Sequence, residues 1–265
     1  QGLKVNPHEL FQKVIPSIKD GMTTTDLDEL IAFSSADMVT THPDYSLLGG
    51  RLLLSRLSKL IDKPLQPVDE TYDFFGAITF LKKYSKKVNG SPSELPSCMY
   101  ERVAKHLAKD KKEYKLFADE LKTKRINCAT PIYTNAGIEG RNGMISCNLT
   151  HLQEDSIDGI ENTLTKIAYA SKEGAGIGLI RSKKSDVTSF SAKAGGVVRF
   201  ADMVQSKMRF YKQGTRSGSC ALYLSVWHRD IMDFLELTLP VGQEELRTRD
   251  LFLSVTINDL FMNKL

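Results

Sequence analysis

Apolar side chains recur every three or four residues through most of the first 125 positions, which is the spacing that gives an α-helix one apolar face. The first such run ends before the turn Asp20-Gly21 and consists of Leu10, Phe11, Val14, Ile15 and Ile18. Thr25 and Asp28 have the spacing of a capping box, so a second helix is predicted to begin there and to continue through Met38.

Helical periodicity continues through the next stretch, with one proline-rich break. A third helix is predicted to begin at His42-Pro43-Asp44 and to continue through Leu57. The segment 62–67 contains two prolines and is predicted to be a linker. Residues 70–125 are predicted to be helical again, except at the turn sequence 89–92. The first half of the chain is therefore predicted to be mostly helical.

After residue 125, short apolar runs alternate with amphipathic segments. The first short run, 126–133, contains Pro131 and is predicted to be a strand. Apolar residues lie on one face of two predicted helices, at 156–171 and 197–211. Further buried strands are predicted at 176–180, 221–227 and 251–257. Because strands and helices alternate, the second half is predicted to be α/β with parallel strand pairing.

The composition narrows the class of protein. The chain has 265 residues, 41% of them hydrophobic and 26% charged, with a net charge of +4. These values are typical of a soluble globular protein. The lysines are scattered and are not interleaved with aromatic residues, so no nucleic-acid partner is expected. No apolar run reaches the length of about 18 residues that a membrane span needs, and no signal peptide is recognisable, so no membrane partner is expected either.

The four cysteines, Cys98, Cys128, Cys147 and Cys220, lie far apart in the sequence. They form no Cys-x-x-Cys pair and have no histidine cluster beside them, so no metal site is predicted. Unpaired thiols indicate a reducing compartment, and we expect a cytoplasmic protein. The chain begins at Gln1 without a methionine, and we expect it to be processed or cut from a longer protein.

The glycine run 174–178 looks at first like a dinucleotide-binding turn. Such a turn follows a strand and opens a helix. Here the glycines follow the predicted helix 156–171 and enter a strand, so the order is reversed. The favoured interpretation is a helix C-cap followed by a closely packed strand.

Short motifs follow one another in a fixed order from residue 127 to the end of the chain. They are Thr130-Pro131, Ser146-Cys147, Asp155-Ser156-Ile157, Ser171-Lys172 before the glycine run, Arg181, Gln213-Gly214 with Arg216, and Trp227-His228. In this order they resemble the large, catalytic subunit of class I ribonucleotide reductase. A looser resemblance upstream, at residues 20–24 and 42–45, is to the second half of that family's ATP-cone.

The resemblance implies a mixed α/β protein with three regions. Residues 1–62 would be a helical, partial ATP-cone-like region. Residues 63–126 would be a helical connection. Residues 127–265 would form the first part of a ten-stranded α/β barrel that carries the effector-specificity site.

The resemblance also assigns a catalytic and substrate-binding set. Cys147 would be a redox-active thiol that supplies a reducing equivalent and then forms a disulfide with a second cysteine. Thr130, Ser146 and Gly176 would hold the ribonucleotide substrate. By residue type alone, the alternative is a buried structural cysteine, which is the commoner role of a lone cysteine.

Asp155, Ser156 and Ile157 would help to bind an effector nucleotide, with Asp155 accepting from the deoxyribose hydroxyl. Lys172 and Arg181 would bind its phosphates. Asp155 could instead, or in addition, cap the helix 156–171. Gln213 and Arg216 would form the loop that links effector to substrate choice, although the same residues suit a solvated turn. The apolar faces of helices 156–171 and 197–211 could be core, or could pair across a homodimer as in the family.

The implied reaction reduces ribonucleoside diphosphates to deoxyribonucleotides by thiyl-radical chemistry, under allosteric control by dNTP and ATP effectors. The implied partners are a radical-generating, metal-containing small subunit and a thioredoxin- or glutaredoxin-like reductant. The chain ends before the family's radical-cysteine motif Asn-x-Cys-x-Glu, so the reaction would need the missing C-terminal half. Between Gly176 and Arg181 the chain is a few residues shorter than the family. A catalytically inactive relative that binds dNTPs and dimerises is the alternative.

Overall fold

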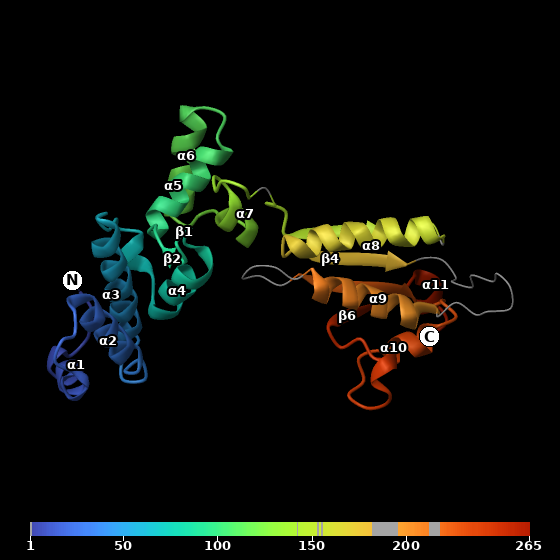
Figure 1. Cartoon of the computed structure of the whole chain (residues 1–265), viewed down its shortest axis with the longest axis horizontal. Helices are drawn as coiled ribbons and strands as arrows, with labels where there is room; N and C mark the ends of the chain where they lie inside the picture. The colour runs from blue at the N-terminus through green and yellow to red at the C-terminus, as the bar shows by residue number, and fades with distance from the viewer. Residues whose placement is uncertain (1, 142, 153, 155, 182–195, 212–217) are drawn as a thin grey trace. The chain divides into compact units, whose positions relative to one another are not determined.

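The computed structural model describes residues 2–141, 143–152, 154, 156–181, 196–211 and 218–265; at Ile180 and Arg181 the description is limited to the backbone (Figure 1). The chain forms two compact units, Gln1–Met144 and Ile145–Leu265. The predicted class, a helical first part followed by an α/β part with parallel strands, is confirmed. No helix among the described residues has the length and apolarity needed to span a membrane.

The first unit is mainly helical. Its helices are α1 (Pro7–Val14), α2 (Thr24–Ala36), α3 (Asp44–Ile61), α4 (Phe74–Thr79), α5 (Pro96–Leu107), α6 (Lys111–Lys122) and α7 (Thr130–Asn135). Shorter helical turns lie at Ile15–Ser17, Asp69–Thr71 and Phe80–Tyr84. The turn predicted at 89–92 joins the small antiparallel hairpin of β1 (Lys87–Val88) and β2 (Ser91–Pro92).

The start of α2 differs from the prediction. Thr23, and not Thr25, is the N-cap residue, and it forms a capping box with Asp26. The Thr23 hydroxyl accepts the Asp26 N–H at 3.2 Å, and the Asp26 carboxylate accepts the Thr23 N–H at 3.0 Å. The pairs Thr23–Asp26 and Thr25–Asp28 both have the spacing of a capping box in the sequence. The box that forms is the first of the two, which directly follows the preceding turn.

The strand predicted at 126–133 is wrong. Thr130–Asn135 is the helix α7, with Pro131 in its first turn. Proline has no N–H and a fixed φ, and the first turn of a helix accepts both properties. Tyr133 and Ala136 are buried in the helical core of the first unit, so residues 127–144, which the sequence grouped with the barrel, pack with the first unit.

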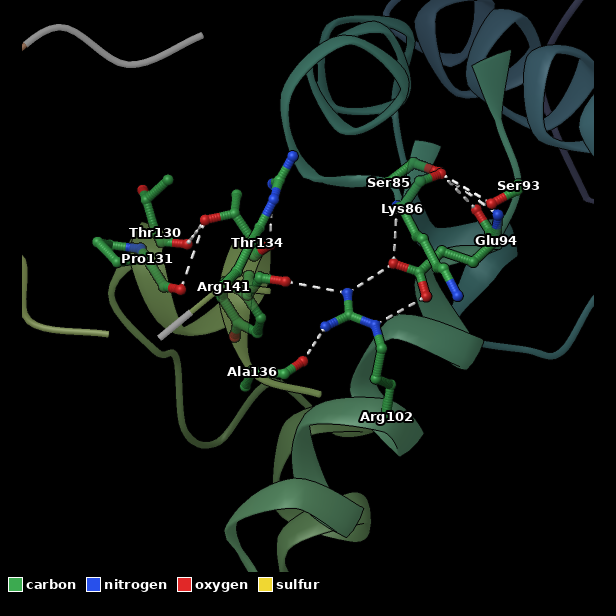
Figure 2. A network of polar contacts seen from close by, with 11 residues as sticks. Ser85, Lys86, Ser93, Glu94, Arg102, Thr130, Pro131, Thr134, Ala136 and Arg141 are labelled. Atoms are coloured by element: carbon green, nitrogen blue, oxygen red, sulfur yellow. Dashed lines mark hydrogen bonds and ion pairs between the residues drawn. The ribbon is translucent and has the colours of Figure 1, made fainter. Parts of the chain in front are cut away.

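A buried ion pair joins three elements of the first unit (Figure 2). The Arg102 guanidinium on α5 binds the Glu94 carboxylate, with Nη2 to Oε1 at 2.6 Å and Nε to Oε2 at 3.0 Å. It also donates to the carbonyls of Tyr133, at 3.0 Å, and Ala136 at the end of α7. Glu94 in turn accepts the Lys86 N–H at 2.9 Å. The pair therefore fixes α7 and the hairpin against α5.

The second unit is a parallel sheet of four described strands in the order β3-β4-β5-β6. The strands are β3 (Cys147–His151), β4 (Gly176–Arg181), β5 (Ser219–Ser225) and β6 (Leu251–Thr256). The helices are α8 (Ile157–Lys172), α9 (Gly196–Phe210), α10 (Ile231–Glu236) and α11 (Asp259–Met262), and a helical turn lies at Glu244–Leu246. The predicted strands β4, β5 and β6 and helices α8 and α9 are confirmed within two residues at each end.

One face of this sheet is covered by helices. Cys220, Leu222 and Leu224 of β5 are completely buried in a core shared with α8 and α9. On the opposite face, Leu149 of β3 and Phe252 of β6 are 67% and 65% exposed. Successive side chains of a strand point to opposite faces of the sheet. The face opposite the helices is therefore exposed on these strands, and we call it the open face.

Candidate functional site

The residues with the clearest chemistry lie where three strands of the sheet begin. Cys147 is the first residue of β3, and its register partner on β4 is Gly176. The register partner of Gly176 on β5 is Ser219. The Gly176 N–H donates to the Ser146 carbonyl at 2.7 Å, which holds the preceding residue against the start of β4. The structure thus brings Ser146, Cys147 and Gly176 together.

The Cys147 thiol is exposed and has a hydroxyl beside it. The Ser146 hydroxyl donates to the Cys147 sulfur at 3.6 Å. Exposure is what a thiol that exchanges with another molecule needs. The interpretation of Cys147 as a buried structural cysteine is therefore wrong.

The other three thiols have different environments. Cys220 is completely buried, and burial raises the pKa of its thiol to about 12. Burial also raises the pKa of Cys128, while a hydrogen bond with Tyr133 acts in the opposite direction. Cys98 is half-buried. Among the residues with described positions, no three His, Cys, Asp or Glu side chains lie close enough to hold a metal ion.

These environments predict a large difference in thiol labelling. Iodoacetamide at pH 8 is expected to alkylate Cys147 at least about tenfold faster than Cys220, because Cys147 is exposed, whereas Cys220 is buried and burial raises the pKa of its thiol to about 12. Peptide mass spectrometry at several times measures both rates. In urea, labelling of Cys220 is expected to become faster, because unfolding exposes its thiol. Equal labelling rates of Cys147 and Cys220 in the native protein would contradict the burial of Cys220.

The glycine run is a helix end, as predicted. Gly174 has φ +70° and follows the last turn of α8. The Gly174 N–H donates to the Ser171 carbonyl and the Ala175 N–H to the Ala170 carbonyl, both at 2.9 Å, which is the Schellman pattern. A left-handed residue there suits glycine. The run therefore ends α8 and starts β4.

The N-terminus of α8 is capped by Ser156. Its hydroxyl accepts the Gly159 N–H at 3.1 Å, so the cap position that the sequence offered to Asp155 is filled by Ser156. Ile157, the first residue of the helix, is 78% exposed. Asp155 itself lies outside the described residues, as do Gln213 and Arg216 of the predicted specificity loop.

The remaining effector residues lie at two opposite ends of the unit. α8 returns from the end of β3 to the start of β4, so Lys172 lies near the end of the sheet at which the strands begin, as Cys147 does. Arg181 is the last residue of β4 and lies at the opposite end, where the strands finish. The 16 residues of α8 span about 24 Å at 1.5 Å per residue. One chain therefore does not bring Ser156 and Lys172 together.

Thr130, the third predicted substrate residue, lies in the first unit. It is the first residue of α7, and its hydroxyl lies 3.1 Å from the Tyr84 hydroxyl.

Two features of the second unit were not predicted from the sequence. The strand β3 was not predicted, and β5 was predicted to begin at Ala221, so that Ser219 was not considered. The sequence carries only a weak signal for β3, because just Cys147 and Leu149 alternate with polar residues along 147–151.

Comparison with known proteins gives the family. The ribonucleotide reductase barrel domain matches residues 145–265, and the ribonucleotide reductase all-alpha domain matches residues 70–141. The chain belongs to the ribonucleotide reductase large-subunit family. The barrel match begins at the residue where the second compact unit begins.

Several ribonucleotide reductase subunits are similar over almost the whole chain. The ribonucleoside-diphosphate reductase large subunit of Dictyostelium discoideum is 33% identical over 313 residues, covering 98% of this chain and 35% of that protein. The large chain of Schizosaccharomyces pombe is 32% identical over 309 residues, covering 98% and 38%. The large subunit of vaccinia virus is 33% identical over 313 residues, covering 98% and 40%. The chain spans about two fifths or less of the length of these relatives.

Proposed function

We propose that this chain is the part of a ribonucleoside-diphosphate reductase large subunit that carries one redox thiol and the dNTP specificity site. The observation that carries the proposal is the exposed Cys147 at the start of a barrel strand, with Ser146 and Gly176 beside it. The relatives' names supply the activity. Reduction would require the rest of the barrel, a radical-generating, metal-containing small subunit and a thioredoxin- or glutaredoxin-like reductant.

The proposed chemistry balances with a thiol pair. When Cys147 and a second cysteine outside this chain form a disulfide, they release two electrons and two protons. Replacing a ribose C–OH bond by C–H with loss of water consumes two electrons and two protons. Radical chemistry would activate the ribose, and the small subunit would generate the radical. A cytoplasmic location is part of the same proposal.

The two ends of α8 support a dimeric effector site. Ser156 and Lys172 are separated by the length of the helix, so one nucleotide would contact both only if a second copy of α8 runs antiparallel beside the first. Exposed apolar side chains are available for such a contact, namely Ile157 and Tyr169 of α8 and Met203 and Phe210 of α9. A homodimer through α8 and α9 would bury them.

Calorimetric titration with dTTP tests the specificity site. We expect saturable binding that weakens by about tenfold or more in Asp155→Ala, which corresponds to about 1.4 kcal/mol. Asp158→Ala is the matched control, because Asp158 is an exposed acidic residue in the first turn of the same helix. Equal weakening in both variants would indicate loss of general negative charge and would contradict a ribose contact by Asp155.

A second candidate is a catalytically inactive relative that binds dNTPs and dimerises. It is favoured by the alignments, which extend over 309 to 313 positions although the chain has only 265 residues. The relatives therefore contain residues that have no counterpart here. Deoxynucleotide formation by the complete native protein, supplied with a small subunit and a dithiol, would exclude this candidate. Binding of dTTP without turnover would favour it.

A further inference from the structure

The starts of three adjacent strands form a small polar notch on the open face of the sheet. Cys147, Gly176 and Ser219 are register neighbours on β3, β4 and β5. Neighbouring residues in a parallel ladder direct their side chains to the same face. The glycine in the middle has no side chain, so the thiol and the Ser219 hydroxyl flank an empty position.

Distances define this notch. A Cβ placed on Gly176 would lie 3.8 Å from the Cys147 sulfur and 3.7 Å from the Ser219 hydroxyl oxygen. It would also lie 3.6 Å from the Ser146 carbonyl oxygen. The same small group could therefore touch the thiol and the Ser219 hydroxyl at once.

The Ser219 hydroxyl is available to a ligand. The Ser219 residue is exposed, and its hydroxyl has no hydrogen-bond partner among the described residues. The Ser146 hydroxyl differs, because it donates to the Cys147 sulfur. A serine hydroxyl can donate one hydrogen bond and accept others, which suits a sugar hydroxyl better than a group that only accepts.

The next row of the same face is apolar. A Cβ on Gly178 would lie 2.8 Å from the Leu149 side chain and 3.5 Å from the Tyr223 ring, so these two side chains close over Gly178. On this face the row next to the thiol is therefore apolar, and the polar side chains of His151 and Tyr223 lie one row further along β3 and β5. A ligand that reaches the thiol meets the Ser219 hydroxyl in the same row.

We propose that Ser219 is a specificity-determining residue that hydrogen-bonds a ribose hydroxyl of the substrate beside Cys147. This inference rests on the proposed function. It adds Ser219 to the substrate-binding residues Thr130, Ser146 and Gly176 that the family resemblance implies. A 2′-deoxyribose would leave the Ser219 hydroxyl without that partner. Ribose would therefore bind more tightly than deoxyribose, by the about three- to tenfold that one solvent-accessible hydrogen bond provides.

Protection of Cys147 from alkylation tests the proposal. Iodoacetamide labelling of the Cys147 peptide is measured by mass spectrometry against increasing ADP or dADP at fixed pH. In the unaltered chain, half-maximal protection is expected at an about three- to tenfold lower concentration of ADP than of dADP. Ser219→Ala is expected to bring the two concentrations together, whereas Ser219→Thr, which keeps the hydroxyl, preserves the difference.

Ser254→Ala is the matched control. Ser254 of β6 lies on the same face, next to Tyr223 in the register, and two rows away from the notch. Its removal is expected to leave the ADP preference unchanged. The circular dichroism spectrum and the labelling rate without nucleotide establish that each variant is folded and that its thiol remains accessible.

Two failures have different meanings. If ADP protects Cys147 and the preference over dADP is the same in Ser219→Ala, the role of Ser219 is wrong while the proposed function stands. If neither nucleotide protects Cys147 in the folded chain at any concentration, the substrate site itself is wrong, and the inference fails with it.

Discussion

Arg102→Met is expected to lower the free energy of unfolding of the first unit by about 3 to 5 kcal/mol, the usual cost of leaving one partner of a buried ion pair alone. The side chains of Arg102 and Glu94 are only 13% and 8% exposed. The variant also removes the donors to the Tyr133 and Ala136 carbonyls (Figure 2). Urea unfolding followed by far-ultraviolet circular dichroism measures the loss, because the first unit is mainly helical.

Two further variants make this prediction specific. Arg125→Met removes an arginine that is 60% exposed and paired with Asp119 and Glu120, and it is expected to cost less than about 1 kcal/mol. Arg102→Met combined with Glu94→Leu removes both buried charges and is expected to recover part of the loss. If the double variant loses as much stability as Arg102→Met and Glu94→Leu lose separately and added together, an unpaired buried charge does not cause the loss in Arg102→Met.

Gly50→Ala is expected to destabilise the first unit by about 3 kcal/mol, although alanine is the better helix former. Gly50 lies within α3, where the helix meets the backbone that enters α4. A Cβ there would lie 2.5 Å from the Asp73 carbonyl group and would also overlap the Tyr72 carbonyl oxygen. These neighbours are backbone atoms, so they cannot rotate away as a flexible side chain would.

The second unit provides a reference for this measurement. Trp227 is the single tryptophan of the chain and lies in that unit, so its fluorescence reports unfolding there. The Gly50→Ala loss is expected in the circular dichroism transition and not in the Trp227 transition. Ser55→Ala, in the same helix, is expected to change stability by less than about 0.5 kcal/mol. A Gly50→Ala variant as stable as Ser55→Ala would show that α3 shifts to accept the methyl group.

Local pattern was sufficient for much of the fold. The period of 3.6 residues along α8 and α9 and the short apolar runs of β4, β5 and β6 are properties of neighbouring residues, so the sequence predicts these elements. Gly174 was interpretable for the same reason, because a helix end followed by a strand is visible locally. The short segment between Gly176 and Arg181 nevertheless forms a strand that pairs along its whole length with β5.

Local pattern failed where packing chose between alternatives. The short apolar run 126–133 has the length of a strand, but Tyr133 and Ala136 are buried in the helical core of the first unit, and residues 130–135 form the helix α7. Two capping boxes were possible at the start of α2, and the chain forms the one at Thr23. The strand β3 carries polar residues at alternate positions, so its apolar signal was too weak to predict it.

The sequence by itself determined the family, through short motifs in a fixed order, and the sulfur chemistry that Cys147 offers. Only the tertiary structure placed Ser219 in the row of Cys147, because 72 residues separate them and strand register decides which side chains meet. It also separated Ser156 from Lys172, because a rigid helix keeps its two ends about 24 Å apart. The residue types determine which chemistry a site can perform, whereas strand pairing and helix length determine how far apart the residues lie.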